Sequence, residues 1–242
     1  MAGTSFVNFK KYGMNRLFRV LKNFWTQDKS FNFLLIVLIC YLFVFLPFLT
    51  ESISSKIIFL FLYYFLLTSS MPFLLKQNRK IIAFLLFILP LILLTIEISY
   101  HSLWVQVFTD VIIITYCALL AYIILLRTFQ QGRINIARVQ GGIIVYLLAG
   151  LIFCLLYHSL NIIESAKSFN GLVGSHRKEF LYFSLCTLTT AGYGDIVPVS
   201  PLARSLSNLE SLLGMLYPAV LLARLVSMEF YYKNSQSENL DK

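Results

Sequence analysis

Six long apolar runs constrain the fold of this chain more than any other feature. A helix that crosses the hydrocarbon core of a bilayer needs about 20 predominantly apolar residues. A soluble domain could not bury so much apolar sequence, since 58% of the chain is hydrophobic and 13% is charged. The predicted transmembrane spans are Phe31–Thr50, Ile57–Leu75, Ile81–Ile96, Leu103–Leu126, Val139–Tyr157 and Leu202–Met228.

The positive charges lie in short segments between these runs. A formal net charge of +9 also suits a nucleic-acid-binding protein, but short basic connections are typical of the cytoplasmic side of a membrane protein. We therefore expect both termini in the cytoplasm and no nucleic-acid partner. The basic clusters are Lys10, Lys11, Arg16, Arg19, Lys22 and Lys29, then Lys76, Arg79 and Lys80, then Arg127, Arg133 and Arg138.

One segment near the C-terminus breaks the pattern of spans. Asn161–Arg177 is polar and reads as an exposed loop, and the apolar stretch Glu179–Thr189 is too short to cross a bilayer. It ends in Gly-Tyr-Gly-Asp, with Pro198 and Pro201 following. Irregular backbone at membrane depth is tolerated where protein or water shields it. The prediction is an all-α membrane protein of six transmembrane helices, with a re-entrant pore helix and filter between the fifth and sixth.

These features divide the chain into five predicted parts. Aromatic and basic residues alternate between Phe6 and Trp25 at roughly helical spacing, which is typical of an interfacial helix. We expect the protein in a plasma membrane, the inner membrane in a Gram-negative bacterium, in contact with lipid. The parts are a cytoplasmic N-terminal segment (1–30), a four-helix transmembrane domain (31–129), a cytoplasmic linker (130–138), a pore domain (139–228) and a short cytoplasmic tail (229–242).

Residues 190–194, Thr-Ala-Gly-Tyr-Gly, have the chemistry of an ion filter. A dehydrated K⁺ ion needs several uncharged oxygens facing one axis, and backbone carbonyls supply them. Consecutive carbonyls face one way when the strand alternates with positive φ, which Gly192 and Gly194 adopt without steric cost. One chain forms only one wall, so four copies around an axis are the natural closed assembly. The expected K⁺ ligands are Thr190, Ala191, Gly192 and Tyr193.

The sequence Thr189-Thr190-Ala191-Gly192-Tyr193-Gly194-Asp195 closely resembles the filter signature of the potassium channel family. The resemblance covers residues 139–228, as outer helix, pore helix, filter and inner helix, and the compact layout resembles prokaryotic members. It implies a homotetramer that conducts K⁺ passively. It also implies that Thr190, Ala191, Gly192, Tyr193 and Gly194 form the filter, and that Asp195 attracts cations at the outer mouth.

The sequence departs from this family's usual pattern around the filter. Ala191 stands where Val or Ile is usual, and Tyr182 and Phe183 stand where many members have tryptophans. Phe183 cannot donate a hydrogen bond to Tyr193, whereas Tyr182 has a hydroxyl that can reach Asp195. Cys186 replaces an acid that partners the mouth aspartate in some members. A weakly selective cation channel is therefore one alternative.

Two further features concern the pore helix and the gate. The C-terminal end of the pore helix, near Thr187 and Thr189, is expected to direct the negative end of the helix dipole toward the cavity. Gly214 falls where the family's inner helix has its glycine hinge, and Pro218 lies one turn later. A hinge and simple helix packing both explain this pair. Glu210 and Arg224, in the same run, are interpreted as inter-subunit or interfacial partners.

The six-span layout resembles voltage-gated relatives, but the charges of a sensor are missing. A sensor helix repeats Arg or Lys every third residue. From Leu103 to Leu126 the only ionisable residue is Asp110, near the outer end, and Arg127, Arg133 and Arg138 follow at the wrong spacing. We expect little or no intrinsic voltage dependence.

Other classes of function fit the sequence less well. A secondary transporter normally has broken helices in both halves, whereas this chain has one re-entrant segment, and a non-conducting regulatory subunit would have a damaged filter. His101, His158 and His176 show no catalytic or metal-ligand spacing, so we expect no enzyme and no cofactor beyond the permeating K⁺. His158, His176 and Glu164 are candidate pH sensors or plain loop residues. Cys40, Cys117, Cys154 and Cys186 are interpreted as small buried side chains.

Overall fold

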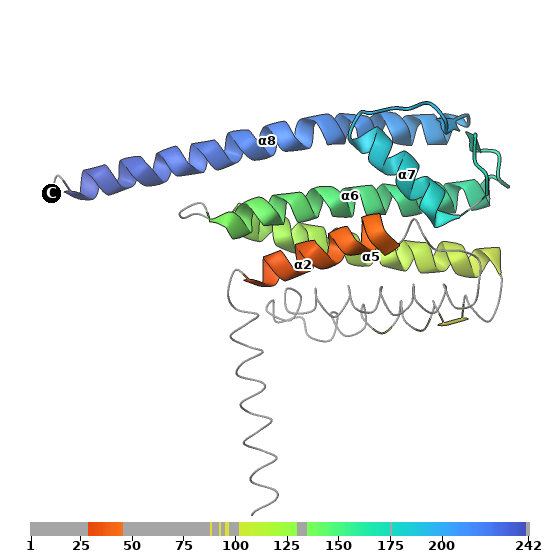
Figure 1. Cartoon of the computed structure of the whole chain (residues 1–242), viewed down its shortest axis with the longest axis horizontal. Coiled ribbons are helices and arrows are strands. Elements are labelled where there is room, and N and C mark those ends of the chain that lie inside the picture. Colours follow the sequence, from red (N-terminus) through yellow and green to blue (C-terminus); the bar gives the residue numbers. More distant parts are fainter. Residues whose placement is uncertain are drawn as a thin grey trace, which may run out of the picture.

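The computed structural model describes residues 29–45, 88, 92, 95–96, 102–129, 135–174 and 176–240. Three helices in these ranges are long and apolar enough to cross a membrane: α5 (Leu103–Thr128), α6 (Ile136–Ile163) and α8 (Pro201–Leu240). They run roughly side by side, with α6 between the other two (Figure 1). This part of the chain has the helical architecture predicted from the apolar runs.

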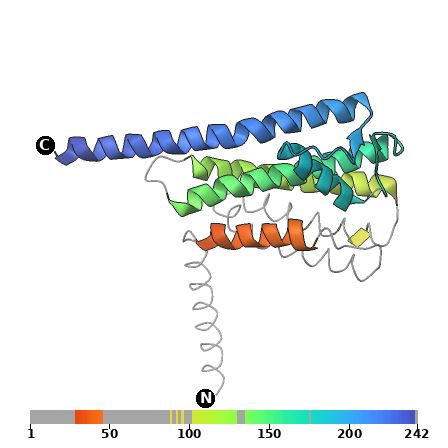
Figure 2. The same ribbon diagram turned by 45° about the horizontal axis from the view of Figure 1, so that its top comes forward.

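A shorter helix covers α6 on the side away from α8. Helix α2 (Lys29–Ile39) continues as a π-helical segment, η1 (Cys40–Phe45), and α2 packs against α6. Figure 2 shows the resulting order, with α8 and α2 on opposite sides of the α5–α6 pair. The core between these helices is built from aliphatic and aromatic side chains, among them Leu34, Leu38, Leu42, Tyr116, Leu120, Ile124, Ile144, Leu148 and Leu151.

The helices differ from the predicted spans mainly at their ends. α6 extends past Tyr157 to Ile163, so the first residues of the predicted loop Asn161–Arg177 are helical. α8 continues past Met228 to Leu240, into the residues predicted as a tail. These helix ends contain polar residues, so the lengths of the apolar runs do not predict them. The N-terminal segment 1–28 and the predicted spans Ile57–Leu75 and Ile81–Ile96 lie outside the described residues, apart from positions 88, 92, 95 and 96.

A short helix and two short strands connect α6 to α8. Helix α7 (Arg177–Leu188) has 12 residues and lies obliquely between α6 and α8 (Figure 1). Strands β1 (Phe169–Asn170) and β2 (Val197–Pro198) pair antiparallel, with Phe169 opposite Pro198. At about 1.5 Å per residue, α7 is near 18 Å long and cannot cross a hydrocarbon core of about 30 Å.

The start of α8 has a local explanation in the sequence. The hydroxyl of Ser200 accepts a hydrogen bond from the backbone N–H of Ala203 at 3.2 Å, which caps the helix. Pro201 occupies the first helical position, where its fixed φ fits and its missing N–H is not needed. The helix passes through Pro218 without ending.

Candidate functional site

One face of α7 is fixed by an aromatic cluster inside the subunit. The Phe183 ring lies 5.1 Å from Tyr157 of α6 and 5.2 Å from Phe169 of β1. Phe180 contacts the same Phe169 ring at 5.5 Å. Edge-on aromatic pairs at these spacings add to the stabilisation from burial. Phe183 therefore holds α7 against α6 and β1.

The chain leaves α7 through a turn that places residues 190–194 in an unusual conformation. The backbone N–H groups of Ala191 and Gly192 both donate to the carbonyl of Cys186, at 2.9 and 3.3 Å. Gly192 and Gly194 have φ of 54° and 80°. Thr190 also has a positive φ, 59°, at a cost of about 1–2 kcal/mol for a residue with a side chain. The sequence indicates the two glycines, but not the strained threonine before them.

The segment 190–194 is exposed in the single subunit. Tyr193 is 74% exposed. A Cβ atom added to Gly192 or Gly194 would meet nothing within 4 Å. The positive φ of these glycines is therefore a property of the strand itself, and the space beside the strand is open to other molecules.

The outer end of this segment is held by Tyr182. Its ring stacks on Tyr193 with a centroid distance of 6.3 Å and an interplanar angle of 6°. Its hydroxyl hydrogen-bonds to the carboxylate of Asp195. The structure thus brings together three of the predicted residues, and Tyr182 makes the contact with Asp195 that the sequence suggests. Cys186 is half-buried and lies beside Tyr182.

The C-terminal end of α7 is held from two sides. The hydroxyl of Tyr146 in α6 donates to the carbonyl of Leu188, the last residue of α7, at 2.9 Å. On the other side, a Cβ added to Gly214 of α8 would lie 1.9 Å from that same carbonyl oxygen. Only glycine permits this approach of α8 to α7. Thr189, which follows, donates its hydroxyl back to the carbonyl of Leu185 at 2.7 Å.

Helices α6 and α8 also contact each other directly through Tyr217. Tyr217 of α8 donates its hydroxyl to the carbonyl of Gly142 in α6 at 2.9 Å, and its ring stacks on Tyr146 with a centroid distance of 5.9 Å. Gly214 therefore has a packing role between α7 and α8. A hinge at Gly214 and Pro218 stays a prediction, as does the cavity-facing role of Thr187, which is half-buried at the end of α7.

The segment after residues 190–194 returns past the end of α6. Gly171 has a φ of 86°, and a Cβ there would lie 1.9 Å from the carbonyl oxygen of Asp195. The backbone N–H of Val199 donates to the carbonyl of Ser168 at 2.8 Å. Glu164 accepts hydrogen bonds from the hydroxyls of Ser168 and Ser200, which lower the pKa of its carboxyl group. These contacts fix the position of Asp195 beside the end of α6.

A buried ionic cluster lies where α5, α6 and α7 meet. Asp110 of α5 is fully buried. One carboxylate oxygen lies 2.9 Å from both Nε and a terminal nitrogen of Arg177, the first residue of α7. The other contacts Nδ1 of His158 at 2.5 Å and accepts the hydroxyl of Ser159 at 3.1 Å. His158 is thus an interior residue of α6, which excludes the interpretation of it as a loop residue.

Glu210 of α8 is a second fully buried carboxyl group. Tyr157 of α6 donates its hydroxyl to Oε2 at 2.6 Å, and Ser184 of α7 lies 2.5 Å from Oε1. The interpretation of Glu210 as an inter-subunit or interfacial residue is wrong, because both partners belong to its own subunit. An ionisable residue in an apolar run was the available signal, but its partners lie far away in the sequence. Arg224, in contrast, is exposed on α8.

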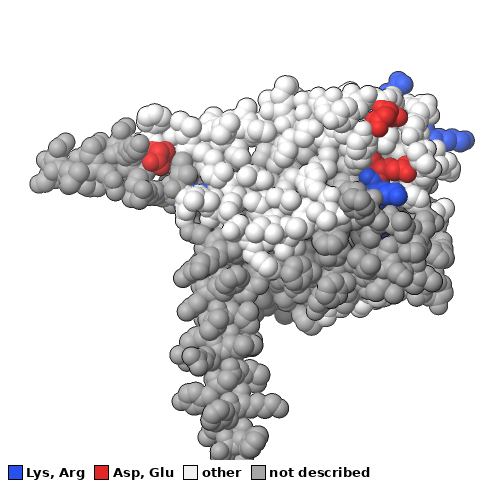
Figure 3. Space-filling view, in the orientation of Figure 1, with Lys and Arg blue, Asp and Glu red and all other residues white. Residues whose placement is uncertain are grey.

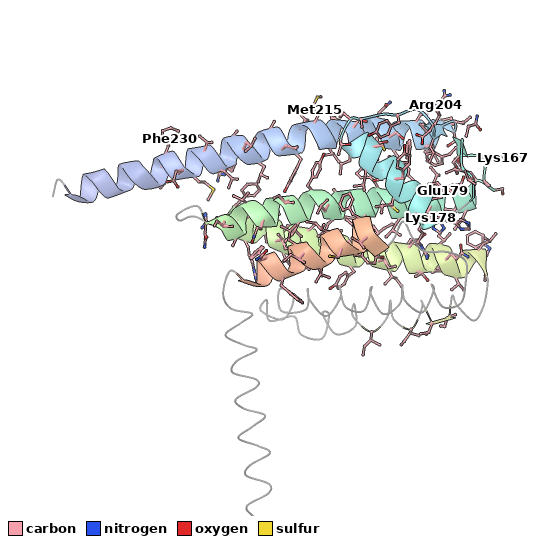
Figure 4. The ribbon with its side chains drawn as sticks, viewed as in Figure 1. Lys167, Lys178, Glu179, Arg204, Met215 and Phe230 are labelled. Carbon is pink, nitrogen blue, oxygen red and sulfur yellow. The ribbon has the colours of Figure 1, made fainter. Side chains whose placement is uncertain are left out.

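Most of the charged side chains visible in Figure 3 lie at the end of the molecule that carries α7, and an acidic side chain lies further along α8. Lys167, Lys178, Glu179 and Arg204 all lie at this end (Figure 4). Along the rest of α8 most of the exposed side chains are apolar, with Arg224 among the exceptions, and Met215, 62% exposed, points away from α6 (Figure 4). The apolar part of α8 is therefore uncovered in a single subunit.

Two comparisons with known proteins found a similarity to ion channels. The profile of a family described as "Ion channel" matches residues 143–230. An inward rectifier potassium channel, Kirbac3.1 of Paramagnetospirillum magnetotacticum, is 40% identical over 77 residues. This similarity covers 31% of the present chain and only 24% of the relative, about a quarter of its length. No solved structure matches the chain.

The region of similarity contains the features described above. Residues 143–230 include most of α6, the whole of α7, the filter-like segment and α8 as far as Phe230. The resemblance inferred from the motif and the match of the profile therefore concern the same residues. Residues 143–230 thus match the ion-channel family, and part of the chain is similar to a potassium channel.

Proposed function

We propose that this chain is one subunit of a homotetrameric, potassium-selective channel in a plasma membrane. The observation that carries the proposal is the exposed segment 190–194, in which Thr190, Gly192 and Gly194 have positive φ. Backbone in this conformation can direct successive carbonyl oxygens to one side. Four such strands around an axis would replace the hydration shell of a K⁺ ion.

Three features of the single subunit support assembly around that segment. The glycines of the strand face open space, and α8 exposes apolar side chains such as Met215 and Leu216. Helix α7 is too short to cross the bilayer, so it acts as a re-entrant pore helix. A membrane protein can keep such irregular backbone only where other protein or water shields it. Three further copies would provide that shielding.

The proposed orientation follows from the charges and the direction of the helices. Asp195 lies at the outer mouth, where its carboxylate raises the local concentration of cations. Both chain termini are then cytoplasmic. In α5, the position of a voltage sensor, the only basic residue is Arg127, in the last turn. Little charge can move through the field, so the channel opens with little or no intrinsic voltage dependence.

Flux measurements on the purified protein test the proposal. The protein is reconstituted in liposomes with a K⁺ gradient, and K⁺ efflux is compared for wild type, Gly192→Asp and Tyr193→Ala. Both variants should reduce efflux to that of empty liposomes. Val173, which is 99% exposed in the loop before α7, provides the matched control: Val173→Asp adds a carboxylate at an exposed loop position and should conduct as wild type does.

Two outcomes would contradict the proposal. Equal efflux from wild type and both filter variants would remove segment 190–194 from the conduction path. A protein that is monomeric by its molecular mass in detergent and still conducts K⁺ would contradict the proposed tetramer. Replacing K⁺ by Na⁺ in the same assay measures selectivity, and equal flux of the two ions would favour a weakly selective cation channel. Currents recorded over a range of voltages check the predicted absence of steep voltage dependence.

A further inference from the structure

The two buried carboxyl groups among the described residues have opposite surroundings. Asp110 is paired with Arg177 and also contacts His158. Among the residues that the structure describes, no basic side chain forms an ion pair with Glu210, whose partners are the hydroxyls of Tyr157 and Ser184. Burying a charged carboxylate without a cation is costly, and such groups take up a proton instead. The surroundings of Glu210 therefore favour its neutral form.

The hydrogen bonds of Ser184 lead to the same result independently. Its hydroxyl oxygen lies 2.8 Å from the carbonyl oxygen of Gly150 in α6 and 2.5 Å from Oε1 of Glu210. A serine hydroxyl has one proton to donate, and the Gly150 carbonyl has none. If Glu210 were ionised, one of these oxygen pairs would have no proton between them. Both contacts are satisfied when Oε1 carries a proton and donates to Ser184, which then donates to Gly150.

We propose that Glu210 is protonated in the conducting channel and that this proton positions the pore helix. This inference rests on the proposed function. The neutral carboxyl group accepts from Tyr157 and donates to Ser184, so it joins α6, α7 and α8 through one directional chain of hydrogen bonds that ends on Gly150. The side chains that form these hydrogen bonds, Tyr157, Ser184 and Glu210, are fully buried. Glu210 is a positioning residue, since it acts on the filter through α7.

Removal of the proton changes the chain of hydrogen bonds at Ser184. An ionised Glu210 draws the Ser184 proton toward itself, because hydrogen bonds to a charged acceptor are the stronger ones. The contact between Ser184 and Gly150 then loses its proton, so the middle of α7 loses this hydrogen bond to α6. The other titratable groups near Glu210 are Tyr146, Cys154 and Tyr157, all from α6. None of them supplies a positive charge to offset the change.

The expected consequence is a channel that loses conduction in alkaline solution. One pH unit above the midpoint of the titration, about a tenth of the groups keep their proton, so K⁺ efflux should fall by about tenfold or more. Glu210→Gln is neutral at every pH and retains a donor and an acceptor. It should conduct at neutral pH and show no alkaline loss. Glu210→Asp is too short to reach both partners, and Glu210→Ala has no polar group, so both should lose selectivity for K⁺ over Na⁺ at every pH.

Infrared spectroscopy of the reconstituted protein gives a readout that does not depend on conduction. A protonated carboxyl group has a C=O stretching band separate from that of a carboxylate. Wild type should show this band at neutral pH and lose it over the pH range in which efflux falls. The band should be absent from Glu210→Gln and unchanged in Asp110→Asn, because Asp110 is ionised in its pair with Arg177.

The outcomes separate this inference from the proposed function. Efflux of Glu210→Gln that falls with pH in parallel with wild type would overturn the inference, as would a conducting wild type without the infrared band. If Glu210→Gln does not fold, the band and the efflux of wild type, followed over the same pH range, decide the question. Absence of K⁺ flux at every pH would contradict the proposed function, while the band would still report whether Glu210 is protonated.

Discussion

Arg177, the first residue of α7, holds the carboxylate of Asp110 in α5, with both Nε and a terminal nitrogen 2.9 Å from the same oxygen. The pair joins a helix that precedes the ion-channel domain to the helix that leads into the filter-like segment. Asp110 is fully buried and the Arg177 side chain is 17% exposed, so the pair is largely shielded from water and salt. A displacement of α5 would therefore act on α7 directly.

Asp110→Asn should lower the free energy of unfolding by up to about 3–5 kcal/mol, because it removes the buried carboxylate that pairs with Arg177. Arg177→Gln should have a similar effect. In the double variant the losses should be clearly less than additive, since each single change already breaks the pair. Unfolding in detergent, followed by denaturant titration, measures this coupling. Arg204→Gln, an exposed position at the same end of the molecule, is the control, and additive losses would show that the pair contributes nothing.

Gly214→Ala should impair folding or assembly, because the new Cβ would lie 1.9 Å from the carbonyl oxygen of Leu188. The backbone of α7 cannot yield as a side chain can. Gly142→Ala is the matched control, since its Cβ would meet only the end of the flexible Leu221 side chain. The yield of tetramer by size-exclusion chromatography distinguishes the two variants. A Gly214→Ala protein with normal yield but altered opening would instead favour the hinge.

Tyr146→Phe and Tyr217→Phe each remove one hydroxyl that donates to a backbone carbonyl at 2.9 Å. Each should cost about 1 kcal/mol of stability. Only Tyr146 holds Leu188 at the end of the pore helix, so only Tyr146→Phe should raise the permeability of Na⁺ relative to K⁺. Reversal potentials in mixed solutions measure this ratio. The same increase in both variants would contradict a specific role for Tyr146.

Glu164 should make the outer loop sensitive to acid. The hydroxyls of Ser168 and Ser200 hydrogen-bond to its ionised carboxylate and lower its pKa. Its contribution to stability is therefore complete above the usual glutamate pKa of about 4.3 and is lost as the pH falls through the lower folded value. Melting temperatures measured from neutral to acid pH should show a smaller acid-induced decrease for Glu164→Gln than for wild type. Ser168→Ala should also reduce the decrease, and identical profiles for all three proteins would exclude the effect.

The contacts around the filter-like segment were only partly predictable. The positive φ of Gly192 and Gly194 is a local property of glycine in this motif, and it could be read from the residues. The contact of Tyr182 with Asp195 spans a short stretch of chain and was also foreseen. The packing of Phe183 against Tyr157 and Phe169 was not, because it depends on how α7 lies against α6.

The sequence by itself determined the membrane character of the chain, the position of its short helix and the resemblance to the potassium channel family. These depend on the lengths of apolar runs and on one local motif, which are read along the chain. Only the tertiary structure decided how the buried carboxyl groups are used. Arg177 lies 67 positions from Asp110, and Tyr157 lies 53 positions from Glu210. The charge state of a buried group depends on neighbours in space. The carboxyl group in α5 therefore forms an ion pair, whereas the one in α8 contacts only hydroxyl groups.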